Sequence, residues 1–256
     1  MHGKQESMQR PTVSCPWAIL EQIRARLSSE RMSRKSRGRP FVTLTYAQSL
    51  DGSIASVEGQ PLPLSSSESL TLTHALRAAH DAILVGIGCV LTDNPRLTVR
   101  LAAGKSPQPV VVDSTLRCPL SANLLTNNGI APWIVTTDRA DAKRQELLEA
   151  AGARIIRLKG SAAAQVDLSA LLECLASMGM DSIMVEGGAR IITSFLVDRL
   201  VDQIVVTIAP LLVGGLRALD RFAETHPGHF PRLLNTFYEK VGDDLVLRGD
   251  PDWTNV

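Results

Sequence analysis

Residues able to do chemistry gather in three short segments, each placed where an apolar run gives way to a loop. These segments are residues 46–52 (YAQSLDG), 93–100 (DNPRLTVR) and 185–188 (VEGG). Together they supply carboxylates, an arginine and paired glycines at the ends of predicted strands. Because open α/β sheets bind ligands at strand ends of this kind, we expect the three segments to meet in one site.

Two glycine pairs follow predicted strands and differ in what they indicate. Gly187 and Gly188 come after Glu186 and directly before a predicted helix. Glycines there let a phosphate approach backbone N–H groups at the positive end of the helix dipole, although a close strand-to-helix turn without a ligand explains them too. Gly86 and Gly88 lack the third glycine of the dinucleotide fingerprint, so a tight turn explains that pair equally well.

Two arginines suit an anionic ligand. Residues 93–95 (DNP) predict a rigid turn from which Arg100 projects on a short extended run, and Arg77 lies on the preceding predicted helix. A guanidinium makes a planar two-point contact with phosphate or carboxylate; a surface salt bridge is the alternative for either arginine. Residues 113–117 (DSTLR) combine acceptors, hydroxyls and a cation at a strand end, which suits a ribose that carries a phosphate.

Several other chemistries lack their sequence pattern. The chain has no G-x-S-x-G, no H-E-x-x-H, no P-loop and no zinc-deaminase signature. Its four cysteines form no C-x-x-C pair, and His74 and His80 do not share a helix face, so we expect no metal. Scattered cysteines fit a reducing compartment, and we expect a cytoplasmic protein.

The composition fits one large α/β domain with a basic start. The chain has 256 residues, 45% apolar and 21% charged, and a net charge of +1. Residues 1–40 carry nine Lys or Arg against three Glu, which we interpret as a solvated arm rather than a nucleic-acid-binding or targeting segment. No apolar run approaches the roughly 18 residues of a membrane helix. We therefore expect neither a nucleic-acid nor a membrane partner.

The apolar pattern predicts an N-terminal extension over residues 1–38 and a folded domain over 39–250. Within the extension, Trp17, Leu20, Ile23 and Leu27 predict a short amphipathic helix that docks on the body or on a partner, and residues 28–39 read as a linker. Strands are expected at 41–47, 82–85, 109–113, 132–136, 154–158, 182–185 and 201–209, helices at 68–80, 139–151, 168–178 and 189–198, and a terminal hairpin at 235–240 and 245–248. This alternation predicts a mainly parallel sheet with helices on both faces and an antiparallel C-terminal edge.

Taken together, the motifs resemble the reductase family of riboflavin biosynthesis. That family comprises the reductase domain of the bifunctional pyrimidine deaminase/reductase and its stand-alone fungal and archaeal relatives. The resemblance runs from residue 39 to 248 and is carried by motifs at 42–52, 73–77, 80–86, 93–100, 112–114, 185–188 and 209–215. It implies a dihydrofolate-reductase-like α/β fold, a homodimer and NADPH as cofactor.

The resemblance also implies a reaction and roles for single residues. The reaction is reduction of the ribosyl group of 2,5-diamino-6-ribosylamino-4(3H)-pyrimidinone 5′-phosphate to a ribityl chain, with NADPH bringing the hydride. The implied catalytic residues are Glu186 and Asp93. The implied substrate-binding residues are Thr45, Arg77, Leu97 and Arg100, with both arginines on the 5′-phosphate. The implied cofactor-binding residues are Ser65, Gly86, Gly88, Asp113, Ser114, Thr137, Gly187 and Gly188.

Two departures from the bacterial bifunctional pattern bear on the substrate. Thr45 stands where that form carries a lysine, and the deaminase half is missing; both favour the diamino-pyrimidinone. Cys89 stands where threonine is usual. Three alternatives stay open: reduction of 5-amino-6-ribosylamino-uracil 5′-phosphate after deamination, a same-fold reductase of another pyrimidine-like or pterin-like substrate, and a non-catalytic NADPH-binding subunit.

Overall fold

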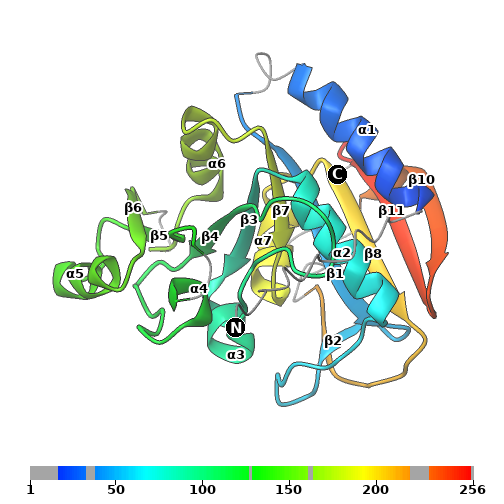
Figure 1. Ribbon diagram of the computed structural model, residues 1–256, viewed down its shortest axis with the longest axis horizontal. Coiled ribbons are helices and arrows are strands. Elements are labelled where there is room, and N and C mark those ends of the chain that lie inside the picture. The colour runs from blue at the N-terminus through cyan, green and yellow to red at the C-terminus, as the bar shows by residue number, and fades with distance from the viewer. Residues whose placement is uncertain (1–16, 33–37, 127–128, 161–163, 220–230, 255–256) are drawn as a thin grey trace, which may run out of the picture.

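A computed structural model describes residues 17–32, 38–126, 129–160, 164–219 and 231–254. One nine-stranded sheet runs through the molecule (Figure 1). Its order is β10 (Arg232–Val241), β11 (Asp244–Asp252), β8 (Gln203–Ala209), β1 (Phe41–Ser49), β7 (Ser182–Glu186), β3 (Ala82–Gly86), β4 (Gln108–Val112), β5 (Trp133–Thr137) and β6 (Arg154–Leu158). The strands from β8 to β6 are parallel, while β11 and β10 are antiparallel. The predicted sheet and its antiparallel C-terminal edge are therefore confirmed.

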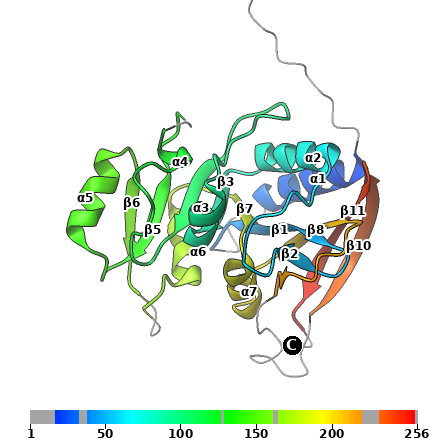
Figure 2. The same cartoon turned by 90° about the horizontal axis from the view of Figure 1, so that it is seen from below.

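Helices cover both faces of this sheet, as predicted. One face packs against α6 (Leu168–Ser177) and α7 (Ala189–Val197). The other face packs against α1 (Ala18–Met32), α2 (Ser67–Ala79), α3 (Ile87–Asp93), α4 (Asn123–Thr126) and α5 (Ala142–Ala150). Figure 2 shows α1 and α2 on one side and α7 on the other. Because both faces are covered, the central strands are continuous apolar runs, and β3 (AILVG) is buried along its whole length.

The helix α1 corrects our reading of the N-terminal segment. It continues to Met32, five residues past the predicted end, and its Ile19, Leu20 and Ile23 are fully buried against the sheet. Ser28 bonds back to the Arg24 carbonyl at 2.9 Å, which lets a linker-like composition continue as helix. Residues 18–32 pack on the folded body, which is one of the two places expected for this helix, and the correction concerns only where the helix ends. Residues 1–16 and 33–37 lie outside the described part of the chain.

The structure contains three elements that the sequence pattern did not reveal. These are α3, the single turn α4 and a two-stranded ribbon of β2 (Ser53–Ala55) and β9 (Leu216–Arg217). Each is seven residues or shorter, too short for a periodic signal. Among the described residues, no helix is long and apolar enough to cross a membrane.

Candidate active site

A cleft of about 1030 Å³ opens at the carboxyl ends of β1, β3, β4 and β7. Its walls include Tyr46, Asp93 and Glu186, one from each segment that the sequence singled out. These segments are far apart in the sequence but meet in space, because the carboxyl ends of parallel strands lie at one edge of a sheet. Ligand pockets commonly measure roughly 300–1,000 Å³, so the cleft has room for a cofactor and a substrate together.

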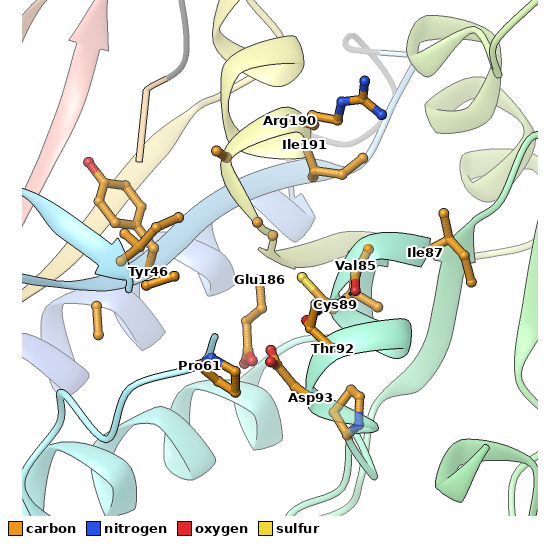
Figure 3. A pocket seen from close by; sticks show the side chains of 18 of the residues that line it. Tyr46, Pro61, Val85, Ile87, Cys89, Thr92, Asp93, Glu186, Arg190 and Ile191 are labelled. Carbon is orange, nitrogen blue, oxygen red and sulfur yellow. Dashed lines mark hydrogen bonds between the residues drawn. The ribbon is translucent and has the colours of Figure 1, made fainter. Parts of the chain in front are cut away.

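Two carboxylates face one another across the cleft. Glu186 ends β7 and Asp93 ends α3, and Figure 3 shows their oxygens turned toward the same space, with Thr92 and Cys89 beside them. Burial raises the pKa of the Cys89 thiol to about 11, and Asp93 adds to the shift. The thiol is therefore protonated at neutral pH and is neither a base nor a nucleophile on this wall.

Arg77, from α2, is bound to Glu186 through two hydrogen bonds. Its Nε donates to Oε1 at 2.7 Å and its Nη2 donates to Oε2 at 2.6 Å, while its Nη1 donates to the Thr98 carbonyl at 3.2 Å. Burial alone would lower the pKa of Arg77, but the charge of Glu186 outweighs it and raises the pKa. Both side chains line the cleft, and the arginine expected at the phosphate is held by a carboxylate.

The loop after α3 is tied to α2 at a second point. His74 accepts a hydrogen bond from the backbone N–H of Arg100 at 2.9 Å through Nδ1. Burial, aided by Arg77 and Arg100, lowers the pKa of His74 to about 4, so the ring is neutral at pH 7 and remains an acceptor. Leu97 is buried in the cleft wall with a left-handed backbone, φ 54°. The Arg100 side chain is exposed and does not line the cleft.

The residues expected at the substrate and cofactor divide into two groups. Those that line the cleft are Thr45, Arg77, Leu97, Ser65, Gly88, Ser114, Gly187 and Gly188. Those that do not are Arg100, Gly86, Asp113 and Thr137.

Gly86 and Gly187 have a packing role. A Cβ on either glycine would lie 2.6 Å from a side-chain carbon of Ile191, so both let α7 approach the strand ends closely. Gly88 differs, because a Cβ there would meet no heavy atom within 4 Å. Open space beside a backbone is what a ligand requires, and of these three glycines Gly88 alone offers it.

Asp113 and Thr137 support the loop that follows β4. Asp113 is fully buried and its Oδ2 accepts from the Cys118 N–H at 2.8 Å. Thr137 donates its hydroxyl to the Ser114 carbonyl at 3.1 Å. The loop they hold brings Ser114 and Arg117 to the cleft, so Asp113 and Thr137 support the site from behind.

Asp51 is a site-building residue whose role the sequence did not reveal. Its carboxylate accepts from the Ser49 hydroxyl at 2.6 Å and from the N–H groups of Val213 and Gly214 at 3.0 and 2.8 Å. These hydrogen bonds hold the pKa of Asp51 well below its usual range. They fasten the loop before β9 to the turn after β1, and the ribbon β2–β9 forms one wall of the cleft.

Arg190 is a second residue of the cleft that was not predicted from the sequence. It lies in the first turn of α7 and lines the cleft next to Ile191 (Figure 3). A cation is unfavourable at a helix N-terminus unless an anion lies nearby. The position of Arg190 at the start of a predicted helix was therefore a sequence feature that indicated an anionic ligand.

Comparison with known proteins agrees with this geometry. Residues 40–247 match the RibD C-terminal domain family. The chain is 33% identical over 257 residues to riboflavin biosynthesis protein RibD of Aquifex aeolicus, covering 96% of this chain and 68% of that protein. It is 37% identical over 199 residues to 2,5-diamino-6-ribosylamino-4(3H)-pyrimidinone 5′-phosphate reductase of Debaryomyces hansenii, covering 72% of this chain and 81% of that protein.

A solved structure of RibD from Acinetobacter baumannii superposes with a TM-score of 0.72 at 25% identity. The match covers 91% of this chain, which spans 64% of the length of that RibD chain. The family match extends over most of the chain and includes all three segments of the cleft. The chain therefore belongs to the RibD C-terminal domain family.

Proposed function

We propose that this protein catalyses a nicotinamide-dependent reduction of 2,5-diamino-6-ribosylamino-4(3H)-pyrimidinone 5′-phosphate, in which the ribosyl group becomes a ribityl chain. The observation that carries the proposal is the pair of facing carboxylates, Glu186 and Asp93, in a cleft built from the family's motifs. The Debaryomyces hansenii relative, which matches over 81% of its own length, is named for this substrate. Thr45 in the cleft supports the diamino form over the uracil form.

The chemistry of this reduction needs one hydride and one proton. Carbon C1′ of the ribosyl group gains the hydride, and the ring oxygen leaves C1′ as a hydroxyl that takes up the proton. The nicotinamide supplies the hydride when it is bound. The protein must orient the sugar, exclude water and hold the proton near the ring oxygen. We assign the proton to Glu186 and the orientation of the sugar to Asp93.

We further propose that the cofactor is NADPH. Its 2′-phosphate needs a cation, and the exposed side chains of Arg117 and Arg190 line the cleft without an ion pair to any described residue. Ser114 lines the same cleft, and the open space at Gly88 leaves room for the cofactor backbone. These features fit a phosphorylated ribose at the outer end of the cleft.

The test is NADPH consumption by the purified protein with the diamino-pyrimidinone and the amino-uracil ribosyl phosphates in separate reactions. We expect rapid oxidation with the diamino form. Oxidation with the uracil form alone would place the enzyme after deamination. If neither substrate is reduced although NADPH binds, the substrate assignment is wrong and the cofactor assignment stands.

We also propose a cytoplasmic homodimer. Leu50, Leu211 and Leu212 are exposed by 66%, 45% and 78%, and the Leu50 N–H donates to the Leu211 carbonyl at 2.8 Å, so the two chain segments that carry these leucines lie side by side. Exposed apolar side chains on neighbouring segments favour a protein contact. The described cysteines are free thiols, which suits a reducing compartment. Light scattering after gel filtration tests the dimer; a monomer mass at micromolar concentration would contradict it.

A further inference from the structure

We infer that Arg77 makes the reaction depend on the substrate's 5′-phosphate, because it holds Glu186 in an ion pair until a phosphate replaces the carboxylate. The inference rests on the proposed function and concerns the same cleft. Arg77 then has a role in specificity besides attracting a phosphate. It keeps the catalytic group Glu186 from acting on substrates that lack a phosphate.

The contacts of the pair are already complete in the structure. Both oxygens of Glu186 accept from Arg77, at 2.7 and 2.6 Å, and the third bonding nitrogen of Arg77 donates to the Thr98 carbonyl at 3.2 Å. The side chains are only 13% and 19% exposed, although both face the cleft. Arg77 thus occupies one lone-pair direction on each oxygen of Glu186 and fixes the plane of the carboxylate, so a sugar group can reach these oxygens only from their remaining directions.

The free-energy cost of separating Arg77 from Glu186 determines which ligand can open this ion pair. Withdrawing Glu186 alone would leave the Arg77 guanidinium in a water-poor place without an anion, which is strongly unfavourable. A phosphate removes this obstacle, because it offers the same planar two-point contact with more negative charge. The exchange keeps Arg77 paired and frees Glu186, whereas a sugar without a phosphate has nothing to exchange.

The loop beside Arg77 shows where the phosphate would arrive. Arg77 reaches this loop at the Thr98 carbonyl, and buried Leu97 adopts its left-handed backbone one residue earlier in the cleft wall. The hydrogen bond from the Arg100 N–H to His74 holds the loop against α2 independently of Arg77. Arg77 is thus able to change partner while the loop stays attached at His74.

The first experiment uses the wild-type protein with the diamino-pyrimidinone nucleoside, which lacks the 5′-phosphate. We expect its kcat to be at least about 100-fold below that of the phosphorylated substrate, and inorganic phosphate to raise it at least about tenfold. The phosphate concentrations used are those that competitively inhibit the phosphorylated substrate, which shows that the anion occupies the site. Competitive inhibition without any rise in the nucleoside rate would overturn the inference.

The second experiment uses Arg77→Gln, which cannot form the ion pair. We expect the nucleoside kcat to rise above the wild-type value and to become insensitive to inorganic phosphate, while the rate with the phosphorylated substrate falls. Arg39→Gln is the matched control, because Arg39 also forms a two-point ion pair, with Asp202 at 2.7 and 2.9 Å, but does not line the cleft. This variant should keep the phosphate dependence of the wild type.

Three other outcomes are distinguishable. If Arg77→Gln lowers kcat equally for both substrates, Arg77 orients Glu186 productively and the inference is wrong. If only the KM of the phosphorylated substrate changes, Arg77 is a simple phosphate ligand and the inference is again wrong. If the wild-type protein reduces neither phosphorylated pyrimidine, the proposed function itself fails. The nucleoside experiment needs no variant, so it remains decisive if Arg77→Gln does not fold.

Discussion

At the scale of single residues, the cleft owes its chemistry to side chains whose charge states are set by their neighbours. Glu186 is held by Arg77, and His74 is kept neutral by burial and by two nearby arginines. The sequence singled out Arg77, Asp93 and Glu186, which line the cleft. It did not single out Arg190, and the side chain of the predicted Arg100 does not line the cleft. The sequence also did not reveal that Arg77 and Glu186 bind each other, because they are 109 positions apart and only the sheet order brings them together.

The first prediction concerns Glu186→Gln. The amide retains the size of the side chain but cannot hold the proton, so we expect kcat to fall by about 100-fold or more. Single-turnover oxidation of NADPH measures the chemical step, and a melting curve checks that the variant stays folded. Asp93→Asn is the comparison. A wild-type rate in Glu186→Gln would remove this residue from the catalytic assignment.

The second prediction concerns Arg100→Ala. Arg100 is exposed at the edge of the loop that carries Leu97, so we expect its guanidinium to reach a phosphate bound between this loop and α2. Loss of one charge-assisted contact should raise the KM for the pyrimidine substrate about tenfold and leave the KM for NADPH unchanged. Steady-state kinetics with each substrate varied in turn separates these effects, and an equal rise in both constants would argue against the assignment.

The third prediction concerns stability at acidic pH. Burial lowers the pKa of both His74 and His80 to about 4, against 6.5 for an unperturbed imidazole. Between these values the unfolded chain binds protons that the folded chain does not, so stability should fall as the pH drops from 6.5 toward 4. The slope should approach about 1.4 kcal/mol per pH unit for each histidine. Urea unfolding across this range measures it, and His80→Gln should flatten the slope.

At the scale of elements, the position of α7 depends on glycine. The Cβ atoms missing at Gly86 and Gly187 leave the space that Ile191 fills, and this places Gly188 at the start of α7 beside the cleft. The sequence analysis left two readings open for these glycines, a ligand or a close turn. The sequence pattern alone did not distinguish these two readings, because the distance between a strand and a helix depends on their three-dimensional packing.

The fourth prediction compares Gly187→Ala with Gly88→Ala. The first places a Cβ 2.6 Å from Ile191, and overpacking of this kind costs about 1–3 kcal/mol of folding free energy. The second meets no atom within 4 Å, so the fold should be unaffected while the KM for NADPH rises. Melting curves and cofactor kinetics on both variants measure these effects. Equal stability of the two variants would contradict the packing role of Gly187.

Most longer elements were predictable, because buried parallel strands and amphipathic helices carry strong apolar signals. The seven residues of α3 were hidden within the Gly-x-Gly pattern. The ribbon β2–β9 was hidden because its two strands lie more than 150 positions apart and are joined through the hydrogen bonds of Asp51 and Ser53. The last third of α1 was hidden because its serines and arginine resemble a linker. Long-range pairing and side-chain hydrogen bonds explain each of these omissions.

At the scale of the whole molecule, the sheet and its helices form one body that includes the N-terminal helix. On the far side of the sheet from α7, α1 packs beside α2 and completes a core cluster with Phe41, Met184 and Val205. Glu239 of β10 accepts hydrogen bonds from the first N–H groups of α1 at 3.2 and 2.8 Å. The basic N-terminal segment therefore includes a helix, α1, that is part of the folded structure.

The fifth prediction concerns truncation. Deletion of residues 1–38 removes the fully buried Ile19, Leu20 and Ile23 together with Leu27, a loss on the order of 6 kcal/mol or more of apolar burial. Because domains are stable by only about 5–15 kcal/mol, we expect a severe fall in melting temperature. Deletion of residues 1–16 is the matched control and should leave activity within a few-fold. If the protein without residues 1–38 had the melting temperature and activity of the wild type, α1 would be dispensable.

The cap that β10 places on α1 also sets an order of events during synthesis. The bonded groups are 221 and 220 positions apart, so the helix that leaves the ribosome early waits for almost the whole chain before its first turn is capped. Contacts between such distant positions close a long loop and form slowly. Until then the first N–H groups of α1 lack the acceptor that Glu239 supplies. Among the described helices, the first in chain order is thus the one whose N-terminal hydrogen bonds wait for one of the last strands.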